Sequence, residues 1–338
     1  MSAGKALLRG GESTRGLAST AASSAPVVDS DFARELLAGL ARQPRAVAPK
    51  FFYDAPGSAL FDRICELPEY YPTRTELALL ERHAKEMAEW IGPGADLVEF
   101  GAGSSRKIRA LLGALPHARR FVPIDISAEH LHGAAALLQS DFPWLEVEPL
   151  AADFTRPLEL PPLAGAPARR VGFFPGSSIG NFTPQEALGF LRQALQLLHG
   201  GGLLVGVDLV KDPAVLHAAY NDAAGITAQF NLNVLARANR ELGANFDLDE
   251  FAHYAFFEPV HSRIEMHLMS RRAQQVRVCG HAFDFAEGQS LHTENSYKYS
   301  VESFRALAEH AGFEPLACWV DERRWFSIHW LAAPARPA

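Results

Sequence analysis

The stretch DLVEFGAGSS, residues 96–105, decides the fold. Its first five residues form a short apolar run, which predicts a buried strand, and its glycines predict a tight turn directly after that strand. A helix is expected to follow over residues 106–115. A strand, a glycine-rich turn and a helix in this order are typical of the first unit of a nucleotide-binding α/β sheet.

The same alternation continues on the C-terminal side of this stretch. Further strands and helices are expected in turn at residues 120–125, 127–138, 170–174, 183–198 and 203–208. Thr183 offers an N-cap for one of these helices, Pro184 suits its first turn, and Glu186 completes a capping box. Strands that alternate with helices indicate a parallel sheet covered on both faces.

The residues after position 208 no longer show this alternation of strands and helices. Lys211 is interpreted as part of a solvated loop, and one long helix is expected over residues 214–242. Residues 263–268 alternate between polar and apolar, like a half-exposed antiparallel strand, and Val276 and Val278 offer it a partner. This pattern predicts a second, α+β domain inserted into the sheet domain.

The C-terminal segment is expected to complete the first sheet. Residues 300–310 predict a helix, and residues 316–320 and 325–331 predict a hairpin. The fold class that follows is α/β, with a Rossmann-like sheet and an inserted α+β substrate-binding domain. The predicted organisation is a disordered tail at 1–29, the inserted domain at 30–75 and 211–297, and the sheet domain at 76–210 and 298–338.

Composition excludes several classes of protein. The 338 residues carry a net charge of −7, which argues against general nucleic-acid binding. Cys65, Cys279 and Cys318 lie far apart, so neither a disulfide framework nor a zinc knuckle is expected. No apolar run approaches the ~20 residues of a membrane helix. The Ser- and Arg-containing tail has the composition of a transit peptide, but we interpret it as disordered, and we expect a cytoplasmic monomer.

Polar side chains are expected at the carboxyl ends of the strands, where such sheets bind ligands. Asp125 ends the second strand and suits a ribose diol, while Asp153 and Phe154 would offer an adenine an acceptor and an aromatic wall. Arg106 stands where a dinucleotide motif has its third glycine, and Glu99 suits a positively charged ligand. These features favour S-adenosylmethionine (SAM) over NAD, with a purely structural glycine turn as the other alternative.

Two further patterns point to different chemistry. Residues 176–180 read GSSIG, formally a hydrolase nucleophile elbow around Ser178, but the next helix signal comes only at Thr183. His130 and His132 diverge on a predicted helix, and the sequence contains no HExxH motif, so we expect no metal site.

Five longer motifs carry a resemblance to a known family. They are PKFFYDAPGSALFDRICELPEYYPTRTE (49–76), VEFGAGSSRK (98–107), FFPGSSIGNFTP (173–184), the run from DLVKDP to FDLDEF (208–251), and RIEMHL with TENSYKYS (263–268 and 293–300). Through these motifs the chain, from about residue 35 to its C-terminus, resembles the histidine Nα-methyltransferases of ergothioneine biosynthesis.

The resemblance implies a class I, SAM-dependent enzyme that trimethylates the α-amino group of L-histidine to hercynine. Its cofactor-binding positions would be Gly101, Lys107, Asp125, Asp153 and Phe154. Its substrate-binding positions would be Tyr70, Asn181, Tyr220, Met266, Glu294 and Ser296. Asn181 and Tyr220 would hold the substrate carboxylate, and Glu294 with Ser296 the imidazole. Tyr53, near the amine, joins Asn181 and Tyr220 as a candidate catalytic residue.

Three activities follow from this resemblance. One is methylation of histidine, the second is methylation of another amino acid or amine, as in fungal alkaloid pathways, and the third is SAM binding without catalysis. Glu294 and Met266 favour histidine, because a carboxylate left without a partner by an apolar ligand is costly. Methyl transfer at a sulfonium is an in-line displacement, so positioning supplies most of the catalysis. A modest base, either Tyr53 or water, would suffice to give the neutral amine.

Overall fold

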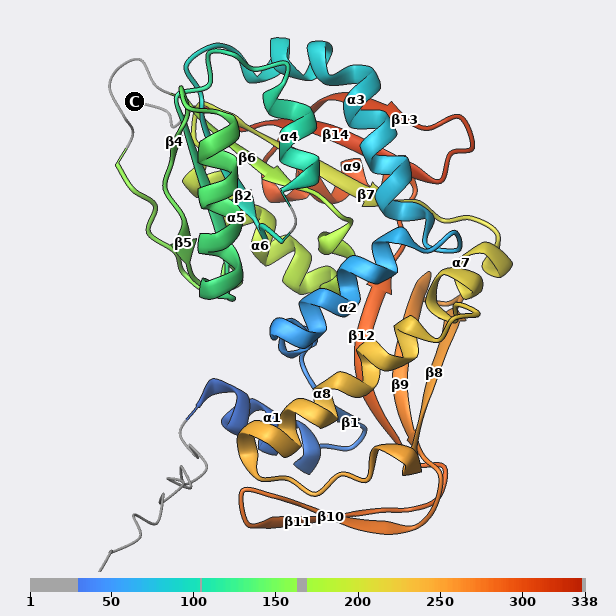
Figure 1. Cartoon of the computed structure of the whole chain (residues 1–338). Coiled ribbons are helices and arrows are strands. Elements are labelled where there is room, and N and C mark those ends of the chain that lie inside the picture. The colour runs from blue at the N-terminus through green and yellow to red at the C-terminus, as the bar shows by residue number, and fades with distance from the viewer. Residues whose placement is uncertain (1–29, 104, 163–168, 336–338) are drawn as a thin grey trace, which may run out of the picture.

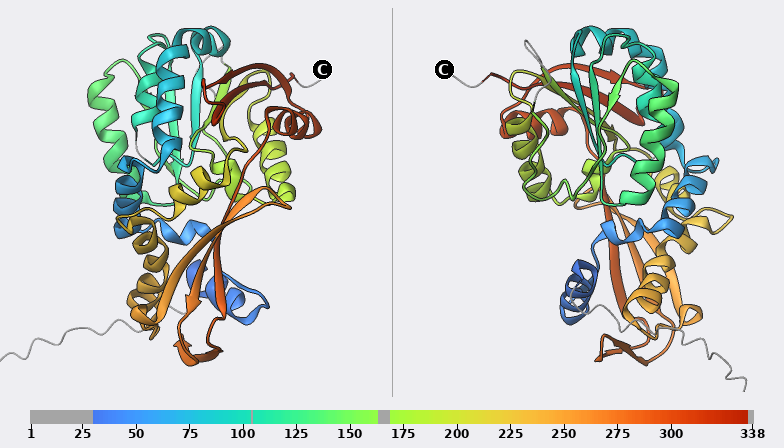
Figure 2. Two further views of the ribbon diagram at one scale, coloured as in Figure 1. Left: turned by 90° about the vertical axis from the view of Figure 1, so that its right-hand side faces the viewer. Right: turned by 60° about the vertical axis from the view of Figure 1, so that its left-hand side comes forward.

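Two β-sheets organise the chain. The computed structural model describes residues 30–103, 105–162 and 169–335, so the predicted disordered tail at 1–29 lies outside the described residues. Figure 1 shows the larger sheet between helices in the upper lobe and long antiparallel strands in the lower lobe. Figure 2 shows the same two lobes from other sides, with the lower strands reaching up to the larger sheet.

The larger sheet has the strand order β13-β14-β7-β6-β2-β3-β4, with β5 also paired to β3. Its strands are β2 (Asp96–Phe100), β3 (Arg120–Asp125), β4 (Glu146–Val147), β5 (Leu150–Ala151), β6 (Arg170–Phe174), β7 (Gly202–Asp208), β13 (Glu314–Val320) and β14 (Phe326–Ala332). The chain runs outward from β2 through β3 and then returns to β6 on its other side, with both neighbours parallel to β2. This switch in direction opens a crevice at the carboxyl end of β2, where such sheets bind ligands.

β2 and β7 are buried along their whole length, which explains their mainly apolar sequences. The predicted C-terminal hairpin is confirmed, because β14 lies antiparallel to both β13 and β7. The predicted α/β class with a Rossmann-like sheet is therefore confirmed.

Helices cover both faces of this sheet. They are α3 (Tyr71–Ile91), α4 (Arg106–Leu112), α5 (Ala128–Asp141), α6 (Pro184–Leu197) and α9 (Val301–Ala311). Adjacent residues of a strand point to opposite faces, so Leu97 joins a core with α3 and α4, whereas Val98 joins a core with α6 and α9. The capping box predicted at Thr183 and Glu186 is present at the start of α6.

The smaller sheet has the order β1-β12-β9-β8. Its strands are β1 (Arg45–Ala46), β8 (Phe251–Glu258), β9 (Arg263–Ser270) and β12 (Ser290–Tyr297), and the hairpin beside it is β10 (Gln274–Val278) with β11 (His281–Phe285). The predicted antiparallel strand is β9, but the partner predicted for it is wrong, because Val276 and Val278 pair with β11. Cys279 and Gly280 both have positive φ and form a two-residue turn that folds the chain straight back.

The helices of the lower lobe share a hydrophobic core with this sheet. They are α1 (Asp31–Ala41), η1 (Pro49–Phe52), α2 (Ala55–Glu66), α7 (Pro213–Tyr220), α8 (Ile226–Leu242) and η3 (Leu248–Glu250). The single helix predicted over 214–242 is in fact two, since the Asp222 carboxylate accepts hydrogen bonds from the backbone N–H groups of Ile226 and Thr227 at 2.8 Å. These bonds start α8 anew after a turn at Gly225, whose φ is 69°.

The chain passes between the lobes at three neighbouring places. Leu209 pairs with Tyr299 in an isolated bridge, so the segment after β7 lies beside the segment after β12. The Tyr71 hydroxyl at the start of α3 lies 2.7 Å from an oxygen of Asp208, at the end of β7. Since these crossings meet at the carboxyl ends of the large sheet, residues distant in sequence converge there.

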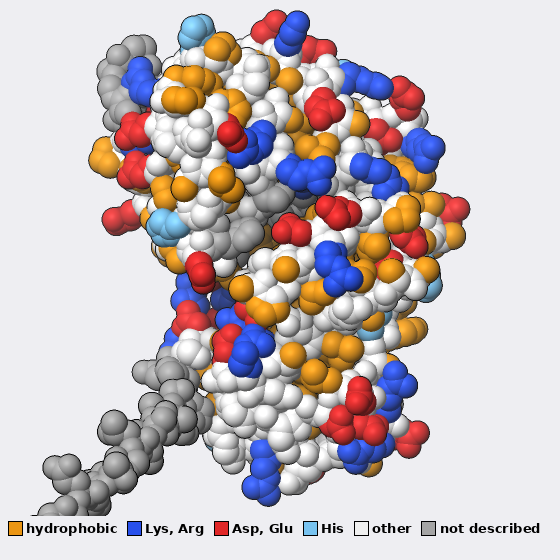
Figure 3. All heavy atoms as spheres, viewed as in Figure 1, with side chains coloured by type: hydrophobic (Ala, Val, Ile, Leu, Met, Phe, Trp, Pro, Cys, Tyr) orange, Lys and Arg blue, Asp and Glu red, His pale blue; other side chains and the backbone are white. Residues whose placement is uncertain are grey.

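The surface carries both signs of charge. On the face in Figure 3, Lys and Arg side chains are interspersed with Asp and Glu. Among the helices in the described part of the chain, none is long and apolar enough to cross a membrane.

Candidate active site

A cavity of about 270 Å³ lies between the lobes, at the carboxyl ends of β2, β3, β6 and β7. It brings together every cofactor and substrate position inferred from the sequence, namely Tyr53, Tyr70, Gly101, Lys107, Asp125, Asp153, Phe154, Asn181, Tyr220, Met266, Glu294 and Ser296. These residues come from both lobes, so neither sheet alone forms the cavity.

The turn after β2 places the backbone of Gly101 and Gly103 at the cavity. Gly101 has a φ of 77°, which favours glycine, and a Cβ there would stand 3.4 Å from the ring of Phe154. The backbone N–H groups of Gly101 and Ala102 both donate to the carbonyl of Ile124 at 2.9 Å, which ties the turn to β3. A Cβ at Gly103 would meet no heavy atom within 4 Å, so the turn leaves open space for a ligand.

Two buried acidic residues, Glu99 and Glu76, lie near this turn. Burial raises the pKa of Glu99 to about 8, against the opposing charge of Lys107. The Lys107 ammonium lies 2.7 Å from a carboxylate oxygen of Glu76, which also accepts from the backbone N–H of Gly176. Glu76, with 1% of its surface exposed, thus joins α3 to the start of α4 and to the loop after β6. Its local sequence gives no sign of this role, because a glutamate in a helix ordinarily faces solvent.

The second and third strands supply the two predicted aspartates. Asp125 ends β3, and its Oδ1 accepts from the backbone N–H of Ser127 at 2.8 Å. Asp153 pairs with the Lys50 ammonium at 3.1 Å and accepts from the backbone N–H of Thr155. Burial would raise the pKa of Asp153, but these partners outweigh it and lower the pKa below its ordinary value. Lys50, which the sequence analysis missed, therefore connects the lower lobe to the predicted adenine position.

On the other side of the cavity, Tyr220 and Ser296 share a buried lysine. The Tyr220 hydroxyl donates to Ser296 Oγ at 2.7 Å. The Lys298 ammonium donates to Ser296 Oγ at 2.7 Å and to the Tyr220 oxygen at 3.2 Å. It also lies 2.8 Å from Asp208 Oδ2, so it contacts all three groups at once.

Asp208 contacts several members of this network. Its carboxylate also accepts from the Tyr71 hydroxyl at 2.7 Å and from the Lys211 ammonium at 2.6 Å. The interpretation of Lys211 as solvated is wrong, since only 3% of its side chain is exposed. Burial would raise the pKa of Asp208, but the charges of Lys298 and Lys211 hold it below its ordinary value.

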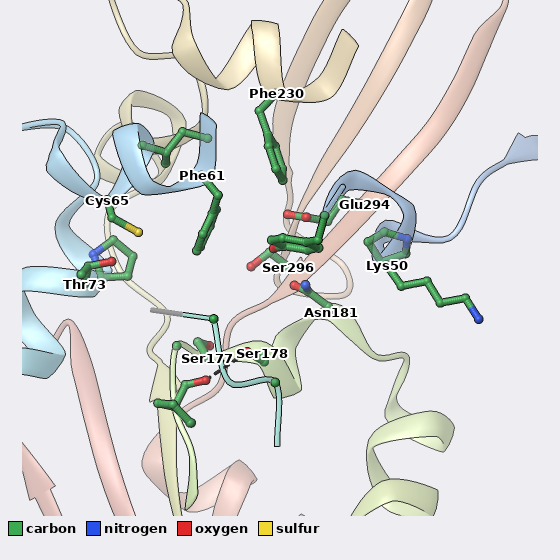
Figure 4. A pocket seen from close by; sticks show the side chains of 18 of the residues that line it. Lys50, Phe61, Cys65, Thr73, Ser177, Ser178, Asn181, Phe230, Glu294 and Ser296 are labelled. Carbon is green, nitrogen blue, oxygen red and sulfur yellow. Dashed lines mark hydrogen bonds between the residues drawn. The ribbon is translucent and has the colours of Figure 1, made fainter. Parts of the chain in front are cut away.

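Glu294 and a group of aromatic rings complete the cavity. Figure 4 shows Phe61, Phe230, Glu294, Ser296 and Asn181 around a common space. Glu294 is 8% exposed, and burial raises its pKa to about 7 in opposition to the charge of Lys298.

Tyr53 and Tyr70 remain neutral phenols, because burial raises the pKa of each well above its ordinary value. The ring of Tyr53 packs edge-on against those of Phe61 and Phe230, with centroids 5.5 and 5.6 Å away. A neutral phenol can orient an amine through a hydrogen bond, but it is a poor acceptor for the proton of that amine. This environment favours water over Tyr53 as the base.

The hydrolase alternative finds no support in the geometry of Ser178. Its hydroxyl donates to the backbone carbonyl of Pro175 at 3.0 Å, whereas an activated nucleophile donates to a base. Ser178 begins the short helix η2 (Ser178–Asn181), and α6 starts only after it. The role of this segment is to carry Asn181 into the cavity.

One group of side chains with metal-ligand chemistry lies outside the cavity. Glu265, His267 and His292 place possible ligand atoms within 4.8 Å of one another. Because Met266 faces the cavity, its neighbours Glu265 and His267 face the opposite side of the sheet. The two imidazoles are stacked, so their lone pairs run side by side instead of converging. This cluster does not test whether the cavity needs a metal.

The doubly wound sheet places Gly101, Asp125 and the buried Glu99 at the crevice where sheets of this kind bind nucleotide-like ligands. The chain belongs to the histidine-specific, SAM-dependent methyltransferase family, whose sequence profile matches residues 32–333.

Three relatives place the chain within this family. Histidine N-alpha-methyltransferase of Mycolicibacterium smegmatis is 45% identical over 302 residues, which cover 87% of this chain and 92% of the relative. The protein of the same name from Mycobacterium tuberculosis is 42% identical, with coverage of 87% and 92%. Ergothioneine biosynthesis protein 1 of Neurospora crassa is 30% identical over 86% of this chain, which matches 33% of that longer protein.

Proposed function

We propose that the chain transfers methyl groups from SAM to the α-amine of L-histidine, three times, to give hercynine. The observation that carries the proposal is that Glu294 and Ser296, which suit an imidazole, line the same cavity as the Gly101 turn and Asp125. The mycobacterial relatives, which are similar along almost their whole length, carry the name of this activity.

The donor side of the cavity fits SAM. The open space at Gly103 admits a ligand close to the backbone, and the Asp125 carboxylate can accept from a ribose diol. Glu99 and Asp125 place acidic groups beside a ligand that carries a sulfonium and an ammonium. We infer that Phe154 offers its ring to the adenine, and that Asp153 offers an oxygen beside the Lys50 pair.

The acceptor side fits an amino acid whose side chain is an imidazole. Asn181 and Tyr220 supply an amide and a hydroxyl for the carboxylate, and Glu294 supplies an acceptor for a ring N–H. In each cycle the amine loses a proton, its lone pair forms the N–CH₃ bond, and the S–CH₃ bond breaks to release S-adenosylhomocysteine. Three cycles from the ammonium release three protons, and the chemistry requires no metal because the thioether is already a good leaving group.

Two further properties belong to the proposal. One is activity as a monomer on a free small molecule. Cys65, Cys279 and Cys318 are free thiols, which suits a reducing compartment such as the cytoplasm.

Mass spectrometry of the purified protein, incubated with SAM and all twenty amino acids together, tests the proposed activity. We expect mono-, di- and trimethylated histidine as the products. Methylation of another amino acid instead would move the chain to a different substrate within its family. SAM binding without any product would contradict catalysis on amino acids.

Replacement of Glu294 by alanine is expected to lower kcat/KM for histidine by about 10- to 100-fold, which is the cost of a hydrogen bond to a charged group. Steady-state kinetics measure it, and Glu265→Ala is the matched control, because Glu265 lies on the neighbouring strand with its side chain on the other face. Unchanged histidine kinetics in Glu294→Ala would remove Glu294 from the substrate site.

The affinity for SAM is expected to rise with pH. Since the pKa of Glu99 is about 8 in the ligand-free protein, Glu99 is mostly protonated at pH 7, and a cationic ligand favours its ionised form. Binding should therefore release a proton below pH 8, and the Kd should fall by up to about tenfold per pH unit until pH 8. Calorimetry in buffers of different ionisation enthalpy measures the proton, and Glu99→Gln should abolish its release. Proton release that persists in this variant would assign it to another group.

A further inference from the structure

Lys298 is a buried cation in the wall of the cavity. It lines the cavity between the lobes, yet only 1% of its side chain is exposed. Its ammonium has three protons, and in this structure they meet Asp208 Oδ2 at 2.8 Å, Ser296 Oγ at 2.7 Å and the Tyr220 oxygen at 3.2 Å. The position of its charge is therefore fixed, and Lys298 can act on a ligand only through the groups that it contacts.

The bond from Lys298 determines what the Tyr220 hydroxyl can do. Because the Tyr220 oxygen accepts from the ammonium, the phenolic proton points away from it, and in this structure Ser296 Oγ receives that proton at 2.7 Å. A substrate carboxylate beside Tyr220 would take the proton instead. Ser296 would then keep its bond from Lys298, so Tyr220 can turn to the substrate without leaving Ser296 unpaired.

The segment that carries Asn181 lies against the same part of the smaller sheet. The short helix η2 packs closely on β12, since a Cβ at Gly180 would stand 2.7 Å from the backbone oxygen of Tyr297. Tyr297 directly precedes Lys298 in the sequence. The two side chains proposed to hold the substrate carboxylate, Asn181 and Tyr220, therefore both come from segments that contact β12 near its end.

A carboxylate at this place lies close to a permanent positive charge. If it accepts from the Tyr220 hydroxyl at about 2.7 Å, it lies within about 6 Å of the Lys298 ammonium. Opposite charges at such a distance attract each other more strongly in a buried site than in water, because little solvent screens them. Burial would lower the pKa of Lys298, but Asp208 and Tyr220 raise it above its ordinary value. Burial also raises the pKa of Tyr220, against the charge of Lys298, so the phenol keeps the proton that it donates.

We propose that Lys298 is a positioning residue whose charge, acting through the Tyr220 hydroxyl, makes the cavity specific for a substrate with a carboxylate beside its amine. This role rests on the proposed histidine methyltransferase function, and it adds the reason why an α-amino acid is preferred over a neutral amine. It is separate from the role of Glu294, which faces the side chain of the substrate. Lys298 is not itself expected to touch the substrate.

Competition between L-histidine and L-histidinamide tests this role. The two molecules share the imidazole and the amine, but the amide is neutral where histidine has a carboxylate. Both are incubated together with SAM, and mass spectrometry at low conversion sums the methylated products of each. The product ratio, divided by the concentration ratio, gives the ratio of the two kcat/KM values. We expect the wild-type chain to prefer histidine by at least about 100-fold, and Lys298→Met to lower this preference by about 10- to 100-fold.

The ratio separates this role from a purely structural one. Both substrates compete for the same enzyme molecules, so a smaller folded fraction or a slower methyl transfer lowers both products alike and leaves the ratio unchanged. The amines of the two substrates differ in basicity, but this difference is the same in every variant and cancels from the comparison. Lys298→Met also leaves Asp208 paired with Lys211, so the buried carboxylate keeps a counter-charge.

Two further variants complete the experiment. Lys298→Gln keeps a hydrogen-bond donor without the charge, should lower the preference in the same way, and keeps the test valid if Lys298→Met fails to fold. Lys211→Met is the matched control, because it also removes an ammonium from Asp208 but leaves the bond from Lys298 to Tyr220 in place. It should retain the wild-type preference within about threefold. SAM binding by each variant reports that it is folded.

The outcomes distinguish this role from the proposed function. A fall of less than about fivefold in the Lys298 variants, or an equally large fall in Lys211→Met, overturns the role of Lys298 and leaves the proposed function standing. A wild-type chain that methylates both substrates equally well also overturns it, because the cavity then does not recognise the carboxylate. If the wild-type chain binds SAM but methylates neither substrate, the proposed function and the role of Lys298 are both overturned.

Discussion

Replacement of Asp208 by asparagine is expected to lower the free energy of unfolding by about 3–5 kcal/mol, which is the cost of removing one partner from a buried ion pair. Asp208 is fully buried and is the shared counter-charge of Lys298 and Lys211. Asparagine keeps the shape of the side chain but leaves two ammonium groups in the interior without a carboxylate. Urea denaturation followed by circular dichroism measures the change.

Asp212→Asn is the matched control for this variant. Asp212 caps α7 from an exposed position, and asparagine is an equally good cap, so the control should change stability by less than about 0.5 kcal/mol. Adding Lys211→Met to Asp208→Asn should recover part of the loss, because one uncompensated charge is removed. A loss below about 1 kcal/mol in Asp208→Asn would contradict the view that both lysines depend on this carboxylate.

Replacement of Asp125 by alanine is expected to weaken SAM binding by roughly 100-fold, about 3 kcal/mol. A carboxylate that accepts from both ribose hydroxyls makes two charge-assisted hydrogen bonds, each contributing about 1.5–3 kcal/mol. Asp125 stands at the carboxyl end of β3, and its Oδ1 also holds the turn at Ser127. Isothermal titration calorimetry measures the affinity.

The control for this prediction is Glu129→Ala, which removes an exposed acid from the first turn of α5, four residues away. It should leave the Kd for SAM within about twofold of the wild-type value. Asp125→Asn keeps an acceptor for the Ser127 N–H and should give an intermediate loss, which separates the ribose contact from the turn. A loss of less than fivefold in Asp125→Ala would place the ribose elsewhere in the cavity.

The central strands could be predicted from local sequence. The bounds of β2, β3 and β6 agree with the predicted ranges, because mainly apolar segments end there at aspartate or are followed by glycine or proline. The break between α7 and α8 was not predicted, since the helical pattern continues through it. That break depends on Asp222, whose capping role is visible only when its side chain turns toward Ile226.

The buried network formed by Asp208, Lys211, Lys298 and Tyr71 could not be predicted from the sequence. Lys211 is interpreted from local sequence as solvated and Lys298 is not singled out, because lysine side chains are ordinarily exposed. Their burial is explained by Tyr71 and Asp208, and the Lys211 ammonium bonds the hydroxyl of Tyr71 from a distant part of the chain. Glu76 was missed for the same reason, because its partner Lys107 and the N–H of Gly176 belong to other elements.

The parallel pairing of β1 with β12 has a consequence for synthesis of the chain on the ribosome. Arg45 aligns with Leu291, so the first strand has no partner until about 250 more residues have been made. At 5–20 residues per second this delay is roughly 12–50 s. During that time the apolar face of α1, with Phe32, Leu36 and Leu40, lacks the core that later buries it. The nascent chain is therefore expected to expose a chaperone-binding segment until its last quarter emerges.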